Sequence, residues 1–313
     1  MNLAKREEIL NVIETLSTRY LKGKVRAVRL SVIALLTGGH ILLEDIPGLG
    51  KTTLALALAG GLGLSFGRIQ CTSDLLPSDI TGLSVFNRED SRFKFMKGPI
   101  FNNIVLADEI NRAMPKTQSA MLEAMEERRV TVDGVTYPLP DPFLVIATQN
   151  PVEQAGTYPL PDSQMDRFTI RSGIGYPPGD IEKGIIRYGS IRDEIKNISP
   201  LVRLEDITEA RQAISEHVYI SEKVVEYIFA VVAATRNHSL IVAGISTRGG
   251  INLAEAARAN AYLEGRDYVV PGDVQAIAVP VGSHRLVLRL ENENLDKEDI
   301  LNAILKDIPV PLV

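Results

Sequence analysis

Four short apolar runs, each followed by a longer stretch of helical periodicity, constrain the fold of this chain more than any other feature of the sequence. Strands that are apolar along their whole length are typical of parallel sheets that are covered on both faces. The pattern therefore predicts an α/β domain, to which residues 168–170 would add a fifth strand. The four runs are Ile41-Leu42-Leu43, Arg68-Ile69-Gln70-Cys71, Ile104-Val105-Leu106-Ala107 and Leu144-Val145-Ile146-Ala147.

This alternation stops at a turn cluster, Tyr176-Pro177-Pro178-Gly179, and every later segment has helical periodicity. A single hydrophobic core stops growing near about 250–300 residues. A chain of 313 residues is therefore expected to form one large domain and a smaller one. We predict an α/β domain over residues 1–176 and a helical domain over 177–313. The expected helices of the second domain are 180–189, 205–215, 221–235, 247–264, 271–280 and 296–306.

Composition excludes several classes of protein. With 45% hydrophobic and 23% charged residues, the chain has the balance of a globular protein and not of a disordered or collagen-like one. Its one cysteine, Cys71, excludes an intrachain disulfide, and four scattered histidines do not favour a structural metal site. No apolar run approaches the roughly 20 residues that a membrane span needs, and the first residues do not resemble a signal peptide. A cytoplasmic protein with no membrane segment is expected.

A glycine-rich loop follows the first strand directly and leads into an Ala/Leu-rich helix. In such a loop, glycines let backbone N–H groups approach phosphate oxygens, and the helix N-terminus adds partial positive charge. Lys51 is expected to reach the β- and γ-phosphates of ATP, and the Thr52 hydroxyl to bind Mg²⁺. Asp45 stands where the usual motif begins with glycine, and a plain glycine turn that caps a helix is the alternative. The expected nucleotide-binding residues are Pro47, Gly48, Leu49, Gly50, Lys51, Thr52 and Thr53.

An acidic pair, Asp108 and Glu109, ends the apolar run over residues 104–107. A P-loop needs a carboxylate for magnesium on a neighbouring strand. Asp108 can hold Mg²⁺ through water, and Glu109 can orient the attacking water and accept its proton. A protein that only binds nucleotide would not need the second carboxylate, so the pair indicates hydrolysis. The alternative is a helix N-terminus, where acidic side chains are stabilising.

Three further polar residues are candidates for the same chemistry. Asn150 follows the run that ends at Ala147 and could position water beside the γ-phosphate, although Asn-Pro is also a common turn. Arg167 is the candidate arginine finger, because phosphoryl transfer needs positive charge at the γ-phosphate; a salt bridge with a nearby aspartate is its alternative. Arg248, at the start of a helix, could contact nucleotide phosphates or lie on the surface.

In their order and spacing these motifs resemble those of an AAA+ ATPase, and the finer pattern resembles the MoxR family. The resemblance runs from about residue 20 to 310 and implies an αβα core with strand order 5-1-4-3-2 and a C-terminal all-α lid. It also implies an insert in the second helix, over about residues 80–97, and a hairpin over about 128–139. The strings that carry it are GGHILLEDIPGLGKTT, DLLPSDITG, GPIFNNIVLADEINRAMPKTQSAMLEAMEE, FLVIATQNPVEQAGTYPLPDSQMDRF and STRGG.

The resemblance also implies roles and partners. Asn150 corresponds to sensor 1, Arg167 to the finger and Arg248 to sensor 2, although this chain has Ser246-Thr247-Arg248-Gly249 where many relatives have Ser-Pro-Arg-Ala. The family implies ATP and Mg²⁺ as ligands and a homo-hexameric ring. It also implies a chaperone-like role in maturing client proteins, including insertion of metal cofactors, and a partner with a von Willebrand factor A domain.

Two other functions remain open at this point. A helicase-like nucleic-acid motor would share the insert and the hairpin, but its tracking groove needs basic residues, and this chain has a net charge of -5. Nucleic acid is therefore not an expected partner. A nucleotide-dependent switch with little turnover would not need Glu109, Asn150 and Arg167 together. Hydrolysis of ATP coupled to remodelling of a protein client is the favoured function.

Overall fold

The structure is a computed structural model, and the described chain divides by its internal contacts into two compact units. We call them the sheet unit, Asn11–Leu160 with Ser172–Leu204, and the helical unit, Met1–Leu10 with Pro161–Arg171 and Glu205–Val313. The boundary at residue 176 stays a prediction. The structure describes residues 3–89, 91–152, 155–189, 194–195 and 197–312.

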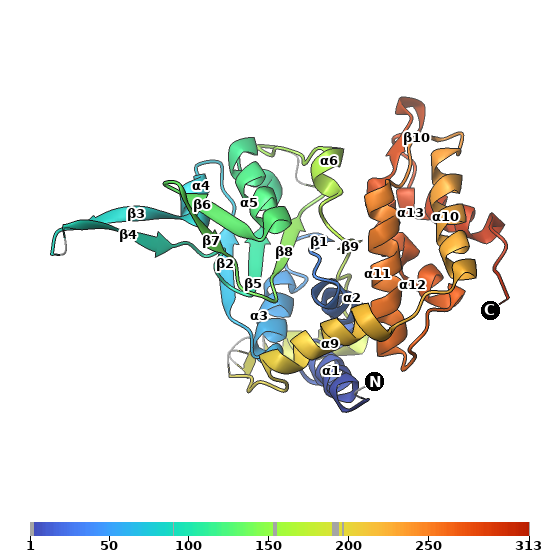
Figure 1. The fold of residues 1–313 in the computed structure, drawn as a ribbon, viewed down its shortest axis with the longest axis horizontal. Coiled ribbons are helices and arrows are strands. Elements are labelled where there is room, and N and C mark those ends of the chain that lie inside the picture. The colour runs from blue at the N-terminus through green and yellow to red at the C-terminus, as the bar shows by residue number, and fades with distance from the viewer. Residues whose placement is uncertain (1–2, 90, 153–154, 190–193, 196, 313) are drawn as a thin grey trace. The chain divides into compact units, whose positions relative to one another are not determined.

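The main sheet has five strands in the order β2-β5-β8-β1-β9 (Figure 1). This is the expected order 5-1-4-3-2, counted from the opposite edge. The registers of β2 with β5, β5 with β8 and β1 with β8 are all parallel. β5 and β8 are buried along both faces up to their last residue, as their unbroken apolar runs predict. The strands are β1 (Ile41–Glu44), β2 (Phe66–Gln70), β5 (Ile104–Asp108), β8 (Leu144–Gln149) and β9 (Ile170–Ser172).

The fifth strand starts two residues later than expected, at Ile170 instead of Phe168. Phe168 is fully buried, but its carbonyl accepts hydrogen bonds from the side chains of His284 and Arg285. A carbonyl that serves two side chains is not part of a strand ladder, and apolar character alone does not reveal this. The expected strand over 168–170 was wrong in its bounds.

Helices connect the strands at the positions that the periodicity predicts. α3 begins after Gly50 and ends before Gly63, and both glycines have positive φ, 96° and 64°, which glycine adopts without steric cost. α7 lies in the sheet unit, although its residues were expected in the helical domain. These elements are α1 (Leu3–Thr15), η1 (Leu16–Tyr20), α2 (Val25–Leu36), α3 (Lys51–Leu62), α4 (Pro77–Thr81), η2 (Ile110–Arg112), α5 (Pro115–Glu127), α6 (Asp162–Met165) and α7 (Gly179–Tyr188).

Two antiparallel hairpins are attached to the sheet unit. The hairpin of β3 (Gly82–Asn87) and β4 (Arg92–Lys97) extends away from the sheet (Figure 1) and coincides with the insert expected over 80–97, of which residue 90 lies outside the described residues. The hairpin of β6 (Arg129–Val132) and β7 (Val135–Pro138) turns at Asp133 and Gly134, both with positive φ. A tight hairpin turn of this kind requires positive φ at both central residues.

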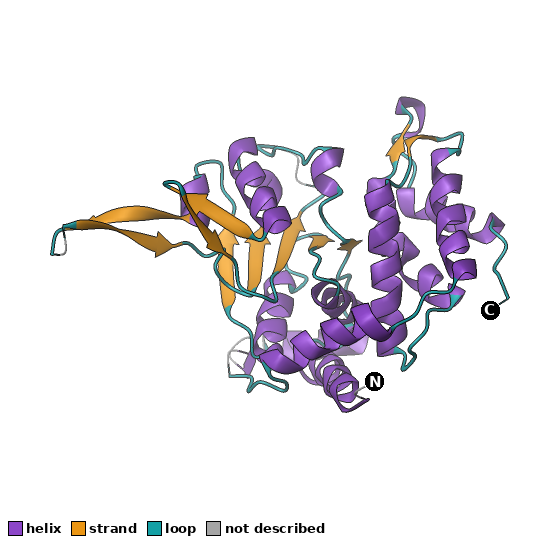
Figure 2. Cartoon of the chain, in the orientation of Figure 1, coloured by secondary structure: helices purple, strands orange, loops and turns teal. Residues whose placement is uncertain are grey.

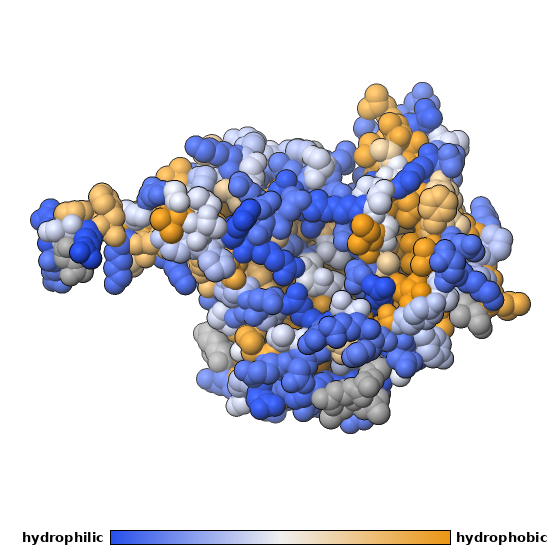
Figure 3. Space-filling model, in the orientation of Figure 1, coloured by the Kyte–Doolittle hydropathy of each residue, from blue (hydrophilic) through white to orange (hydrophobic). Residues whose placement is uncertain are grey.

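The β3–β4 hairpin exposes several apolar side chains among charged ones (Figure 3). At its base Phe95 stacks on Tyr137 of β7, with 4.2 Å between the ring centroids, so the two hairpins contact each other. Exposed apolar side chains on a projecting element are typical of interaction surfaces. The exposed residues are Leu83, Val85, Phe86, Phe93 and Met96.

The C-terminal part of the helical unit is built almost entirely of helices (Figure 2). The expected all-α character needs one correction, because β10 and β11 form a short antiparallel ladder. Strands of two or three residues are too short to leave an alternating pattern in the sequence. No helix of the described residues is long and apolar enough to cross a membrane. The elements are α9 (Leu204–His217), α10 (Glu222–Arg236), β10 (Ile241–Ala243), α11 (Thr247–Leu263), α12 (Pro271–Gly282), η3 (Ser283–Arg285), β11 (Val287–Leu288), η4 (Leu290–Asn292) and α13 (Lys297–Asp307).

A buried histidine links α5 to the sheet. The Nδ1 atom of His40 accepts a hydrogen bond from the Val145 backbone N–H at 3.0 Å, and Nε2 lies 3.2 Å from the carbonyl of Met125. Only a neutral ring with its proton on Nε2 satisfies both contacts. Burial accordingly lowers the pKa of His40 from 6.5 to about 4.

This lowered pKa makes stability depend on pH. The unfolded imidazole takes up a proton below pH 6.5, and the folded one does so only near pH 4, so the contribution of His40 is complete above pH 6.5 and declines as the pH falls toward 4. The decline should reach about 3 kcal/mol. The variant His40→Asn keeps an acceptor for Val145 but does not titrate. In urea unfolding at a series of pH values, its free energy of unfolding should fall less than that of the wild type; equal slopes would contradict the assignment.

Candidate nucleotide-binding site

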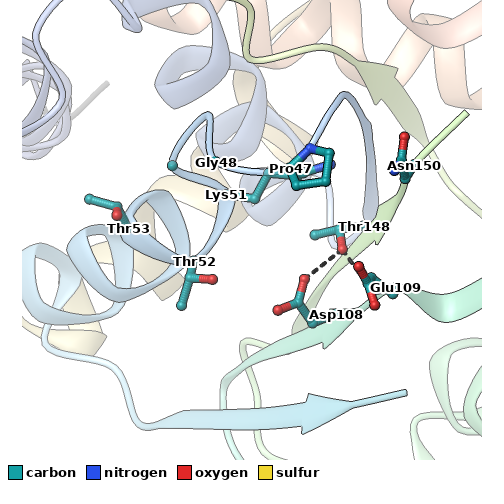
Figure 4. Close-up of a pocket in the computed structure, with 10 residues that line it drawn as sticks. Pro47, Gly48, Lys51, Thr52, Thr53, Asp108, Glu109, Thr148 and Asn150 are labelled. Atoms are coloured by element: carbon teal, nitrogen blue, oxygen red, sulfur yellow. Dashed lines mark hydrogen bonds between the residues drawn. The ribbon is translucent and has the colours of Figure 1, made fainter. Parts of the chain in front are cut away.

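One cavity of about 360 Å³ lies at the carboxyl ends of β1, β5 and β8 (Figure 4). This is where open parallel α/β sheets usually bind ligands. Its wall combines the loop after β1 and the first turn of α3 with the ends of β5 and β8. The lining residues are Pro47, Gly48, Gly50, Lys51, Thr52, Thr53, Asp108, Glu109, Thr148 and Asn150.

Most of the expected nucleotide-binding residues therefore meet at one cavity. Leu49 belongs to the same turn, but it is not among the described residues that line the cavity. Thr148 lines it and was not singled out from the sequence. Its only sequence signal is a hydroxyl at the end of an apolar strand, next to the expected Asn150.

The loop after β1 has the geometry of an anion-binding site. Gly48 and Gly50 have φ of 87° and 96°, and the space beside the Cα of Gly48 holds no atom within 4 Å. Gly50 is the N-cap of α3 and has no side chain to accept hydrogen bonds from the first turn. The first N–H groups of a helix have no partner within the helix, so they can donate to a phosphate. The cavity fits the phosphates of a nucleotide.

Lys51 folds back over the loop. Its ammonium group donates to the carbonyl of Asp45 and lies 3.4 Å from that of Gln149. Burial lowers the pKa of Lys51, and the carboxylates of Asp45, Asp108 and Glu109 oppose that shift. A lysine held by two carbonyls at the wall of the cavity is well placed to bind an incoming phosphate.

The acidic pair is organised by Thr148, as the dashed lines in Figure 4 show. The Thr148 hydroxyl donates to Asp108 Oδ1 at 2.8 Å and accepts from the backbone N–H of Glu109 at 2.8 Å. Thr148 is 1% exposed, so these hydrogen bonds are shielded from water. A hydrogen bond is stronger in such a buried environment than in water. One buried side chain of β8 thus fixes both acidic residues at the end of β5.

Glu109 has an unusual backbone conformation, with φ of 57° and ψ of 53°. A residue other than glycine occupies this region only where its surroundings hold it there. The hydrogen bond to Thr148 supplies one such constraint. The side chain is held as well, because Arg112 Nε lies 2.9 Å from Glu109 Oε2. The sequence does not reveal this pair, since Arg112 reads as one of several basic residues.

Asp108 presents oxygen donors suited to a hard cation. Its Oδ2 accepts from Arg68 Nη2 at 2.8 Å, across from β2, and its Oδ1 accepts from Thr148. Thr52 lines the same cavity. Magnesium takes oxygen ligands and keeps several waters. The Thr52 hydroxyl and the Asp108 carboxylate, whose oxygens already accept hydrogen bonds from Arg68 and Thr148, therefore fit a magnesium ion bound partly through water.

Asp45 has a structural role that explains its place in the loop. Its Oδ2 accepts hydrogen bonds from the backbone N–H groups of Ile174 at 2.6 Å and Gly175 at 2.7 Å. A Cβ at Gly173 would lie 3.1 Å from the same oxygen. The carboxylate therefore ties the loop to the segment after β9. A glycine at position 45 has no carboxylate and could not accept these two hydrogen bonds.

The remaining expected residues divide between the units. Asn150 lines the cavity, and its Oδ1 also accepts a hydrogen bond from the Val152 N–H at 3.2 Å. Asn150 therefore begins a turn and also faces the cavity. Arg167 and Arg248 belong to the helical unit. Arg167 is half-buried after α6, and Arg248 is exposed in the first turn of α11. Their roles stay predictions.

Two family models match the chain. The ATPase family associated with various cellular activities (AAA) matches residues 40–170, which include every residue that lines the cavity. The AAA lid domain matches residues 233–304, which include α11 and α12. The fold, the cavity and these matches together define an AAA+ ATPase with a helical lid.

Relatives over nearly the whole chain narrow this class. The chain is 39% identical to Chaperone MoxR1 of Mycobacterium tuberculosis, over 94% of this chain and 80% of that protein. It is 46% identical to protein YeaC of Bacillus subtilis, over 94% and 92%. The crystal structure of a candidate ATPase from Cytophaga hutchinsonii matches with a TM-score of 0.91 and 40% identity, over 99% and 97% of the two chains. The chain belongs to the MoxR family of AAA+ ATPases.

The geometry around Thr148 predicts the effect of removing its hydroxyl. Thr148→Val keeps the shape but leaves Asp108 and the Glu109 N–H without their shared partner, so ATP turnover should fall about 10-fold through loss of alignment. Nucleotide affinity, measured with a fluorescent ATP analogue, should change little because the phosphate loop is untouched. Thr148→Ser keeps the hydroxyl and should keep most of the activity. Full turnover in Thr148→Val would contradict the role.

Proposed function

We propose that the chain hydrolyses ATP with Mg²⁺ at this cavity and uses the turnover to remodel or mature client proteins. One observation carries the proposal: a phosphate-binding loop, an acidic pair and a polar residue from three different strand ends line a single cavity. Membership of the MoxR family supports the chaperone-like part. The insertion of a metal cofactor into a client is one form that this maturation could take.

Each residue then has a distinct task. The backbone of Gly48 and Gly50 and the side chain of Lys51 bind the phosphates. Glu109 orients a water molecule for attack and accepts its proton, and Asn150 holds that water against the γ-phosphate. Thr52, and Asp108 through water, would hold magnesium, which would supply charge neutralisation on the phosphate oxygens.

Glu109 needs to be released for this task. In the present conformation its carboxylate is paired with Arg112, and this ion pair engages one of its two oxygens. Both side chains are partly exposed, so the pair is a weak one. A small rearrangement on nucleotide binding is therefore enough to free Glu109.

Client binding and assembly complete the proposal. The exposed apolar side chains of the β3–β4 hairpin are the candidate contact for a protein client. A homo-hexameric ring places a second subunit beside each nucleotide, because head-to-tail contacts between identical subunits close into rings. A protein with a von Willebrand factor A domain is the proposed partner that delivers or selects clients.

Two variants separate binding from hydrolysis. Glu109→Gln keeps the side-chain shape but cannot accept a proton, so ATP and Mg²⁺ should still bind while turnover falls about 10²-fold or more. Lys51→Ala should lose nucleotide affinity itself. The measurements are titration with a fluorescent ATP analogue and steady-state phosphate release. Equal affinity in Lys51→Ala and wild type would contradict the assignment of the phosphate loop.

The proposed finger, Arg167, acts on the nucleotide of a neighbouring subunit. A finger supplied in trans is typically worth about 10³ to 10⁵ in rate, so Arg167→Ala should bind ATP nearly normally and lose turnover. A mixture of Arg167→Ala with Lys51→Ala tests the geometry. An Arg167→Ala subunit beside a Lys51→Ala neighbour has an intact phosphate loop and receives an intact finger, so activity should return in part.

The control for this mixture is each variant alone, which should be inactive at the same total concentration. Native mass spectrometry with subunits of different mass establishes that mixed rings form. Mixed rings without any recovery of activity would show that Arg167 does not act across the interface.

A further inference from the structure

Arg285, at the end of η3 in the helical unit, is a buried arginine that lies outside the nucleotide-binding motifs. Its side chain is 1% exposed. A buried guanidinium is costly unless its N–H groups are all engaged, so its partners should reveal what it does. Burial lowers the pKa of Arg285, and the Asp166 carboxylate opposes that shift.

Most partners of Arg285 lie on both sides of Arg167; its Nη1 also contacts the Val281 carbonyl and the ring of His284. Its Nε donates to Asp166 Oδ1 at 2.7 Å. Its Nη2 donates to the carbonyls of Asp166 at 3.2 Å and Phe168 at 2.8 Å, and Nη1 lies 3.4 Å from that of Thr169. One side chain thus holds the backbone immediately before and after Arg167.

The same aspartate reaches the helix that carries Arg248. The second oxygen of Asp166 accepts a hydrogen bond from Ser246 Oγ at 3.3 Å. Ser246 is the N-cap of α11 and accepts from the Gly249 N–H at 3.0 Å. Asp166 therefore joins the segment that bears Arg167 to the helix start that bears Arg248.

Gly249 provides the space for this arrangement. A Cβ at Gly249 would lie 2.7 Å from Cδ and 3.0 Å from Nε of Arg285, closer than side chains pack. This is the position where the chain has Ser-Thr-Arg-Gly in place of Ser-Pro-Arg-Ala. The glycine lets Arg285 pass beside the start of α11 to reach Asp166.

We propose that Asp166 and Arg285 are positioning residues that fix Arg167 and Arg248 to each other as one rigid part of the helical unit. The proposal rests on the proposed role of Arg167 as a finger for the neighbouring subunit. It adds that the lid helices position the finger of their own subunit. A change sensed by Arg248 at one nucleotide would then be passed to the next site through Arg167.

If the proposal is correct, Arg285→Met should share the defect of Arg167→Ala: ATP binds, turnover is lost, and activity returns only beside a subunit with a correctly held finger. Alone, Arg285→Met should bind the fluorescent ATP analogue within about 3-fold of wild type but lose at least about 10²-fold in turnover, because its finger is displaced. Mixed with Lys51→Ala, which donates a correctly held finger, it should regain activity, up to about a quarter of wild type per subunit on random mixing. Mixed with Arg167→Ala, it should regain none, because neither subunit donates a working finger.

A matched control removes a different arginine–aspartate pair from the same unit. Arg266 donates to both oxygens of Asp273, which is 1% exposed. Arg266→Met should lower the melting temperature as Arg285→Met does, yet hydrolyse ATP alone. Loss of turnover in both variants in proportion to lost stability would overturn the positioning role.

Asp166→Asn keeps the test decisive if Arg285→Met does not fold, since the amide preserves shape and one acceptor. It should show the same pattern of recovery with Lys51→Ala and none with Arg167→Ala. Full turnover in Asp166→Asn alone would overturn the positioning role of Asp166 and Arg285. Recovery of activity in the mixture of Arg285→Met with Arg167→Ala would overturn it as well. Failure of the Arg167→Ala and Lys51→Ala mixture would instead overturn the finger in trans, so the two failures are distinguishable.

Discussion

The parallel pairing of β1, β5 and β8 is the constraint on which the rest of the sheet unit depends. Parallel strands that are buried on both faces can carry polar chemistry only where they end, because an unpaired polar group within the sheet would be costly. The three strands end in register, so the phosphate loop, the acidic pair and Asn150 emerge at one edge. The cavity is a direct consequence of that shared edge.

Two polar side chains at this edge are hydrogen-bonded to the chain around them, and this gives the site its precision. Thr148 fixes the acidic pair, and Asp45 ties down the phosphate loop. Each of these groups is bonded to backbone or carboxylate, as buried polar groups must be. They hold the side chains that face the cavity without taking part in the expected chemistry.

The helical unit shows the same logic at a second place. Arg285 donates to the Asp166 carboxylate and to carbonyls around Arg167, and Asp166 connects that segment to α11. A buried ion pair is weak evidence for stability, because desolvation offsets its attraction. Its value here lies in holding two exposed or half-buried arginines in a defined relation.

The sequence by itself determined the α/β class, the strands and most of the residues at the cavity. Apolar runs of strand length and the glycine loop before a helix are local signals, because they are formed by consecutive residues and can be recognised without the fold. The strand order followed from the family resemblance and agrees with the structure. Only the tertiary structure decided the roles of Thr148, Asp45 and Arg285, the late start of β9 and the β10–β11 ladder. Their partners lie up to 130 residues away in the sequence, and no pattern of residue types shows which distant backbone group a single polar side chain will reach once the chain is packed.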